Sequence, residues 1–145
     1  MRNPAQAWLV AAAALSAAAA LLHLAVIAGG PGWYRFFGAG EGMARMAEQG
    51  SATPALITVG IATLLAVWSA YALAGAGLIP QLPLMRTALV AITAVYLLRG
   101  LILFPVLAMN RGRVDSFTLW SSLIVLVYGI TYAVGTKKAW ATLCS

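Results

Sequence analysis

Residues 87–109 read TALVAITAVYLLRGLILFPVLAM, and this apolar run decides the class of the protein. At a rise of about 1.5 Å per residue, it is long enough to cross roughly 30 Å of hydrocarbon as an α-helix. Its one charge is Arg99, near the middle. An unpaired guanidinium at bilayer depth costs about 2.5 to 3.5 kcal/mol on insertion scales. We therefore expect Arg99 to contact a partner group, backbone carbonyls or a wet cavity, and it is the main functional candidate.

The composition of the whole chain agrees with a membrane protein. Of the 145 residues, 63% are hydrophobic and 8% are charged, and the mean hydropathy is +0.93. Such a chain has too little polar surface to cover a soluble globule. The formal net charge is +6, but the basic residues stand at the ends of apolar runs instead of clustering on one face. They are typical of membrane-flanking charges, so we expect no nucleic-acid partner.

Four apolar runs are long enough to span a membrane, at approximately residues 7–28, 54–79, 87–109 and 117–136. The sequence thus predicts an all-α integral membrane protein, with one transmembrane domain over residues 1–145 and four transmembrane helices in an up-down bundle. The links at 80–86 and 110–116 are short, which favours antiparallel neighbours. The first run could be a signal peptide, but it continues unbroken to residue 28, which favours a helix.

Only a few charged residues indicate which side of the membrane the termini lie on. Each side of the membrane receives the same number of basic residues in this topology, so the count alone is a tie. The charge at the amino end and the pair Lys137–Lys138 after the last run favour cytoplasmic termini. We therefore expect a multi-pass protein of a bacterial inner (plasma) membrane with both termini in the cytoplasm.

The long connection at residues 29–53 contains a short charged segment. Glu41, Arg45 and Glu48 are spaced three and four residues apart, which predicts a short amphipathic helix over residues 41–49. This helix could lie on the surface in water. Alternatively, it could be a lid that dips between the helices, with Trp33 and Tyr34 as anchors at the membrane interface.

Small residues and prolines indicate how the helices pack. A stripe of small residues recurs every four positions in the second run and would let another backbone approach closely; it comprises Thr58, Ala62, Ala66, Ala70 and Ala74. The partner could be another helix of this chain, a second copy or a different membrane protein. Thr53 and Pro54 suit an N-cap and a first helical turn. Pro105 predicts a kink just beyond Arg99, because its ring clashes with the carbonyl of Leu101.

A candidate ligand pocket follows from the expected depths of the polar residues. Arg99 and His23 should lie in the membrane half nearest the long connection, so Glu41 or Glu48 could reach them, and the glycines around Glu41 favour it. Tyr34, Arg35 and Tyr96 complete the candidate ligand-binding set. Alternatively, His23 makes only a hydrogen bond between helices, and Arg99 contacts only carbonyls and water. The tyrosines of the later helices suit packing better than a proton wire; they are Tyr71, Tyr96, Tyr128 and Tyr132.

The sequence contains few residues that are suited to catalysis or metal binding. The chain has one histidine and one cysteine, so a histidine or cysteine metal cluster is not expected, and no motif indicates a cofactor or a catalytic residue. The sequence therefore favours a protein that binds, or helps to translocate, a lipophilic or anionic small molecule or a lipid near Arg99. The alternatives are an accessory subunit of a larger membrane complex and, third, a small membrane enzyme acting on a lipophilic substrate.

Overall fold

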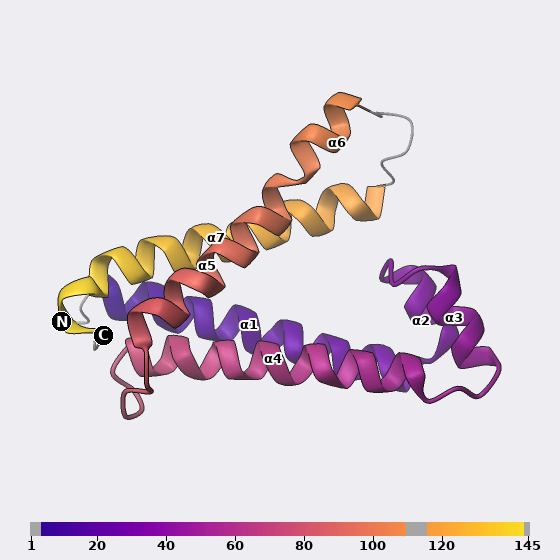
Figure 1. Ribbon diagram of the computed structural model, residues 1–145, viewed down its shortest axis with the longest axis horizontal. Helices are drawn as coiled ribbons and strands as arrows, with labels where there is room; N and C mark the ends of the chain where they lie inside the picture. The colour runs from indigo at the N-terminus through magenta and orange to yellow at the C-terminus, as the bar shows by residue number, and fades with distance from the viewer. Residues whose placement is uncertain (1–3, 110–115, 144–145) are drawn as a thin grey trace. The chain divides into compact units, whose positions relative to one another are not determined.

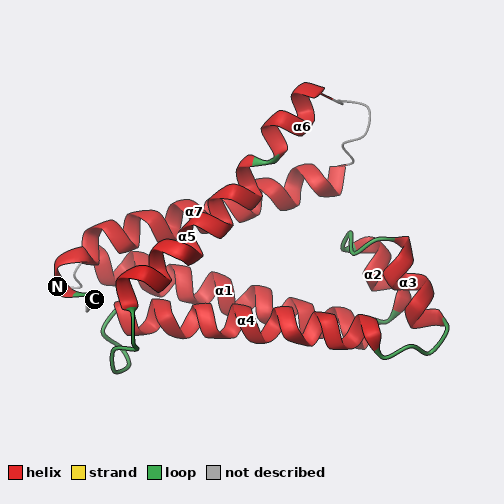
Figure 2. Cartoon of the chain, in the orientation of Figure 1, coloured by secondary structure: helices red, strands yellow, loops and turns green. Residues whose placement is uncertain are grey.

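The computed structural model describes residues 4–109 and 116–143, and regular structure in this part is helical, without strands (Figure 2). The predicted link at 110–116 lies outside the described residues apart from Ser116. The elements in chain order are α1 (Pro4–Gly29), α2 (Pro31–Phe36), α3 (Glu41–Glu48), α4 (Thr53–Gly75), α5 (Met85–Leu101), α6 (Leu103–Met109), α7 (Ser116–Ala139) and the 3-10 turn η2 (Trp140–Thr142) (Figure 1).

Four segments of the described chain are long and apolar enough to cross a membrane. They are Pro4–Gly29, Thr53–Gly75, Met85–Pro105 and Ser116–Thr142. The predicted all-α class and the four apolar helices are confirmed, whereas the up-down order of the bundle stays a prediction. The chain divides into two compact units, one formed by Met1–Ser16 with Trp68–Ser145 and the other by Ala17–Val67.

In the first unit, α5 and α7 lie side by side and antiparallel (Figure 1). A Cβ atom added to Gly100 would lie 2.8 Å from Cα of Leu126, and one added to Gly129 would lie 2.9 Å from the backbone nitrogen of Leu97. The two contacts are reciprocal, since each helix contributes one glycine and one leucine. Glycine is therefore required at both positions for the helices to approach this closely.

The third predicted helix is interrupted as its proline indicates. α5 ends at Leu101, Ile102 forms a turn, and α6 begins at Leu103. Pro105 cannot donate a hydrogen bond to the carbonyl of Leu101, which is four residues earlier. The predicted kink just beyond Arg99 is therefore confirmed, and α6 turns away from α7 beyond it (Figure 1).

The end of α4 was placed too late by the apolar pattern. The run continues through Leu78 and Ile79, but the helix ends at Gly75. Gly77 adopts a φ of 73°, and the N–H of Leu78 donates to the carbonyl of Leu73 at 3.0 Å. This is the Schellman arrangement, in which a left-handed glycine terminates a helix whatever the polarity of the residues that follow.

The predicted stripe of small residues on α4 is only partly buried. Thr58, Ala62 and Ala74 are buried, but Ala66 is exposed and Ala70 is half-buried. A helix has 3.6 residues per turn, so a strict spacing of four drifts around the axis. Most of the buried positions within the helix instead alternate between spacings of four and three; they are Thr58, Ala62, Leu65, Ser69 and Ala72.

The start of α4 also differs by one residue from the prediction. Thr53 is already helical instead of acting as the N-cap. Its backbone N–H donates to the hydroxyl of Ser51 at 3.3 Å, so Ser51 supplies the polar group that the sequence assigned to Thr53. Pro54 occupies the first turn as predicted, because its missing N–H has no helical acceptor there.

In the second unit, α2 and α3 form a helical hairpin after the end of α1. The predicted helix at 41–49 is confirmed as α3, whereas the six residues of α2 were not predicted. The hairpin encloses a small core of Val26, Tyr34 and Ala44. Partly buried apolar side chains pack against this core, namely Phe37, Met43 and Ala47.

Candidate functional site

Arg99 lies in the last turn of α5, and its side chain is exposed. Its Nη1 atom donates a hydrogen bond to the hydroxyl oxygen of Ser122 on α7, at 3.1 Å. Ser122 itself is buried. The guanidinium therefore has a neutral hydroxyl partner from the neighbouring helix, which is an association that the sequence did not indicate.

Glu41 and Glu48 are held by arginines of their own hairpin. Nε of Arg35 lies 2.8 Å from one carboxylate oxygen of Glu41 and Nη2 lies 3.0 Å from the other, which is a bidentate pair. Nη1 of Arg35 reaches Glu48 at 2.7 Å, and Nε of Arg45 reaches Glu41 at 3.1 Å. The structure thus brings together the predicted residues Arg35, Glu41 and Glu48. Pairing of a glutamate with Arg99 stays a prediction.

These ion pairs predict an unusual titration of Glu41. Its pKa is lowered to about 2, chiefly by the hydrogen bond from Arg35 and next by that from Arg45. Because the folded pKa lies below the ordinary 4.5, the contribution to hairpin stability is complete above that value and is lost as the pH falls through about 2.

Carboxyl-resolved NMR titration should therefore give a midpoint for Glu41 near 2, and Arg35→Gln should raise it toward 4.5. Arg45→Gln is the matched control and should raise it less, since it removes only the second interaction. A wild-type midpoint already at the ordinary value would contradict the ion-pair network. All four side chains are largely solvated, so we expect the pKa of Glu41 to move more clearly than global stability.

Two other predicted site residues of the second unit, His23 and Tyr34, make contacts of a different kind. Nδ1 of His23 is 2.7 Å from the carbonyl oxygen of Ala19, so Nδ1 carries the proton and donates to its own helix. Tyr34 is only 2% exposed and belongs to the hairpin core, which contradicts its predicted role as an interface anchor. A common pocket of His23 and Arg99 stays a prediction.

Tyr96 belongs to a buried cluster of hydroxyl groups in the first unit. The Ser16 hydroxyl oxygen lies 3.0 Å from that of Tyr96 and 2.8 Å from that of Tyr132. Tyr132 in turn donates to the backbone carbonyl of Trp68 at 3.0 Å. The rings of Trp68 and Tyr96 meet edge to face with centroids 4.9 Å apart. This cluster joins residues of α1, α4, α5 and α7, so its members pack the helices as the sequence predicts for the tyrosines.

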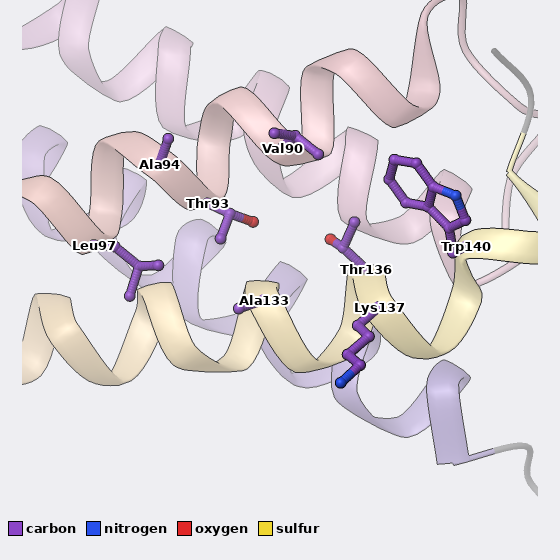
Figure 3. Close-up of a pocket in the computed structure, with 8 residues that line it drawn as sticks. All are labelled: Val90, Thr93, Ala94, Leu97, Ala133, Thr136, Lys137 and Trp140. Carbon is purple, nitrogen blue, oxygen red and sulfur yellow. The ribbon is translucent and has the colours of Figure 1, made fainter.

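A groove between α5 and α7 is the best candidate for a ligand site. It has a volume of about 570 Å³, which is within the range of small-molecule sites. Figure 3 shows Thr93 of α5 and Thr136 of α7 facing each other across it. The lining residues are Val90, Thr93, Ala94 and Leu97 on α5, with Ala133, Thr136, Lys137 and Trp140 from α7 and the turn after it.

The polar groups of the groove are few and distinct. Thr136 is only 5% exposed, and in the described part of the chain its hydroxyl has no hydrogen-bond partner. Thr93 faces it from α5 (Figure 3) and donates to its own helix, at 2.6 Å from the carbonyl of Leu89. A buried hydroxyl without a partner costs about 1 to 3 kcal/mol, so Thr136 is the polar group of this groove with the most to gain from a hydrogen bond.

One end of the groove is positively charged. Lys137 is exposed, and none of the ion pairs among the described residues involves it. The guanidinium carbon of Arg86 lies 5.2 Å from the ring centroid of Trp140, which is a cation–π arrangement. The Nε atom of Arg86 is buried, also without a hydrogen-bond partner in the described residues. The groove thus combines an apolar wall with Lys137 and the indole of Trp140, and Arg86 lies against that indole.

The groove residues were missed by sequence reasoning. Thr93 and Thr136 are ordinary helix residues until the register of α5 on α7 makes them face each other. The one available signal was the cluster of Lys137, Lys138 and Trp140 after an apolar run, which is typical of a membrane interface. Within residues 4–109 and 116–143, no three metal-binding side chains gather to form an ion site.

Comparison with known proteins gives no assignment. No protein-family model matches the chain, and neither a curated protein nor a solved structure does.

Proposed function

We propose that this is a multi-pass membrane protein that binds an acidic lipid in the groove between α5 and α7. Support for membrane insertion comes from the four apolar helices and from the large apolar side chains that they leave exposed, such as Leu56, Leu98 and Val127. Exposed side chains of this size along whole helices are suited to acyl chains and not to water.

The observation that carries the ligand assignment is the buried hydroxyl of Thr136, which has no hydrogen-bond partner among the described residues and lies inside a largely apolar groove. Val90, Ala94 and Leu97 extend over about 10 Å of α5, given the helical rise, and offer an acyl chain an apolar wall. Lys137 and Arg86 supply the positive charge that a phosphate headgroup requires, and Trp140 belongs naturally at the headgroup level. Basic pockets between membrane helices characteristically bind acidic headgroups.

Thermal unfolding in lipid nanodiscs tests this proposal. Phosphatidylglycerol should raise the melting temperature relative to phosphatidylcholine, with about 2.7 kcal/mol of stabilisation at a hundredfold excess over Kd. Lys137→Gln should remove most of the shift. Lys138→Gln is the matched control, because it deletes the same charge from the next residue, which does not line the groove.

Thr136→Val should raise the stability of the lipid-free protein and lower the stabilisation by acidic lipid. It should stabilise the lipid-free protein by about 1 kcal/mol, because it removes an unsatisfied buried hydroxyl, yet it should reduce the shift caused by the acidic lipid. If Lys137→Gln and Lys138→Gln lose the shift equally, the lipid acts through general surface charge and the groove is not its site. The accessory-subunit interpretation then becomes the better one.

A further inference from the structure

The α2–α3 hairpin has one aromatic side and one ionic side. Trp33 and Phe36 are 43% and 72% exposed, and they lie three residues apart on one face of α2. Phe37 links them to the interior, because its ring centroid is 5.6 Å from that of Trp33 and 5.0 Å from that of Phe36. Phe37 itself packs on the hairpin core. Phe37 therefore holds the exposed rings of Trp33 and Phe36 against the packed core of the hairpin.

The absence of a side chain at Gly29 lets the indole of Trp33 pack against the backbone of α1. A Cβ atom added to Gly29 would lie 2.1 Å from the indole, so the ring lies directly against the backbone at the last residue of α1. α1 is itself one of the four helices able to span a membrane. The exposed indole is thus held at the end of a candidate span, where membrane proteins concentrate tryptophan.

The ionic side of the hairpin is internally neutral. Arg35 and Arg45 balance Glu41 and Glu48, and the ion pairs join all four. The α2–α3 hairpin therefore carries no net charge from these four residues that would attract acidic lipid. Its exposed apolar area is aromatic, and aromatic rings partition into the headgroup region of zwitterionic and acidic bilayers alike.

We propose that the α2–α3 hairpin docks on the lipid surface, with Trp33 and Phe36 inserted among the headgroups and α3 facing water. The hairpin fixes the depth at which α1 ends in its leaflet. This inference rests on the proposed membrane insertion but is independent of the α5–α7 groove. It also replaces Tyr34 by Phe36 as the second anchor.

Spin labelling of the full-length chain in phosphatidylcholine vesicles tests the proposal. In a Cys144→Ser background, single cysteines are introduced by Phe36→Cys on the aromatic side, Gln49→Cys just after α3, and Leu64→Cys on the exposed side of α4. Collision rates with oxygen and with a water-soluble nickel chelate report depth. Labels at positions 36 and 64 should favour oxygen, position 64 more strongly, and the label at 49 should favour nickel several-fold.

A label at position 32 leaves both Trp33 and Phe36 in place, unlike the label at position 36. Gly32 shares the aromatic face of α2 and has open space around it, so Gly32→Cys should give the same result as Phe36→Cys. Adding phosphatidylglycerol should leave these ratios unchanged, because the hairpin is neutral.

Three outcomes overturn the inference in distinguishable ways. If positions 32 and 36 favour nickel while 64 favours oxygen, the protein is inserted but the hairpin is in water. If position 64 also favours nickel, the membrane insertion of the proposed function fails as well. If positions 32 and 36 are shielded from both reagents, a protein surface covers the rings instead of lipid.

Discussion

Gly129→Ala should destabilise the protein by about 1 to 3 kcal/mol, the usual cost of forcing an extra carbon into a closed packing contact. The new Cβ would lie 2.9 Å from the backbone nitrogen of Leu97. No side-chain rotation can relieve a clash with backbone, so α5 and α7 have to separate. Because Leu97 also lines the groove, acidic-lipid binding should weaken together with stability.

Gly60→Ala is the matched control for this prediction. Gly60 is also in the interior of an apolar helix, but a Cβ there has no neighbour within 4 Å. Alanine should therefore be neutral or stabilise the helix by up to about 1 kcal/mol, through its better helix propensity. Unfolding in detergent with a chemical denaturant measures both variants. Equal stabilities would mean that the backbone of α5 at Leu97 does not approach Gly129 of α7 this closely.

The second large effect is expected at Ser16, because the buried hydroxyl cluster has a defined direction. Tyr132 uses its only proton on the carbonyl of Trp68, so Ser16 must donate to Tyr132 and Tyr96 must donate to Ser16. Ser16→Ala leaves the buried Tyr96 hydroxyl without its acceptor and should cost roughly 1 to 3 kcal/mol.

Tyr96→Phe should destabilise the protein less than Ser16→Ala. It removes the first donor of the hydrogen-bond chain, so no other buried donor loses its acceptor. The double variant should then be less destabilised than the sum of the two single variants, because the stranded donor is gone. Ser121→Ala serves as a control for loss of a hydroxyl on α7, where the Ser121 hydroxyl donates to the carbonyl of Thr118 in its own helix. Strict additivity of the Ser16 and Tyr96 effects would refute the directed chain.

The same direction shows why the tyrosines do not form a proton wire. A relay has to deliver its proton to a group that can take it up, whereas this chain ends on the peptide carbonyl of Trp68, which already lies within a helix. The hydroxyls therefore act as polar contacts between helices, and such contacts specify how helices pair inside an apolar environment.

Much of the fold follows from apolar length and local chemistry. The four long runs predict four helices because backbone groups in an apolar environment must bond within the segment. Glu41, Arg45 and Glu48 predict α3 by their spacing, and Pro105 predicts the interruption of the third run. α2 was missed because six residues show no helical period, and the end of α4 was missed because hydropathy does not register the left-handed Gly77.

The candidate site was much less predictable than the fold. Charge singled out Arg99, Arg35 and the glutamates, since a charged residue in an apolar chain is conspicuous. The groove depends on which faces of α5 and α7 meet, and that is set by glycine contacts between residues about thirty positions apart, Gly100 with Leu126 and Leu97 with Gly129. No local pattern reveals that register, so the buried hydroxyl of Thr136 could not be singled out beforehand.

The break at Ile102 also changes the electrostatic surroundings of Arg99. Pro105 has no N–H to donate to the carbonyl of Leu101, whereas the carbonyl of Leu98 still accepts from the N–H of Ile102 at 3.0 Å. The Leu101 carbonyl lies two residues beyond Arg99, within the same turn, and its oxygen carries a partial negative charge inside an apolar sequence. The proline that interrupts the helix thus provides a peptide oxygen close to a guanidinium that already donates to the hydroxyl of Ser122.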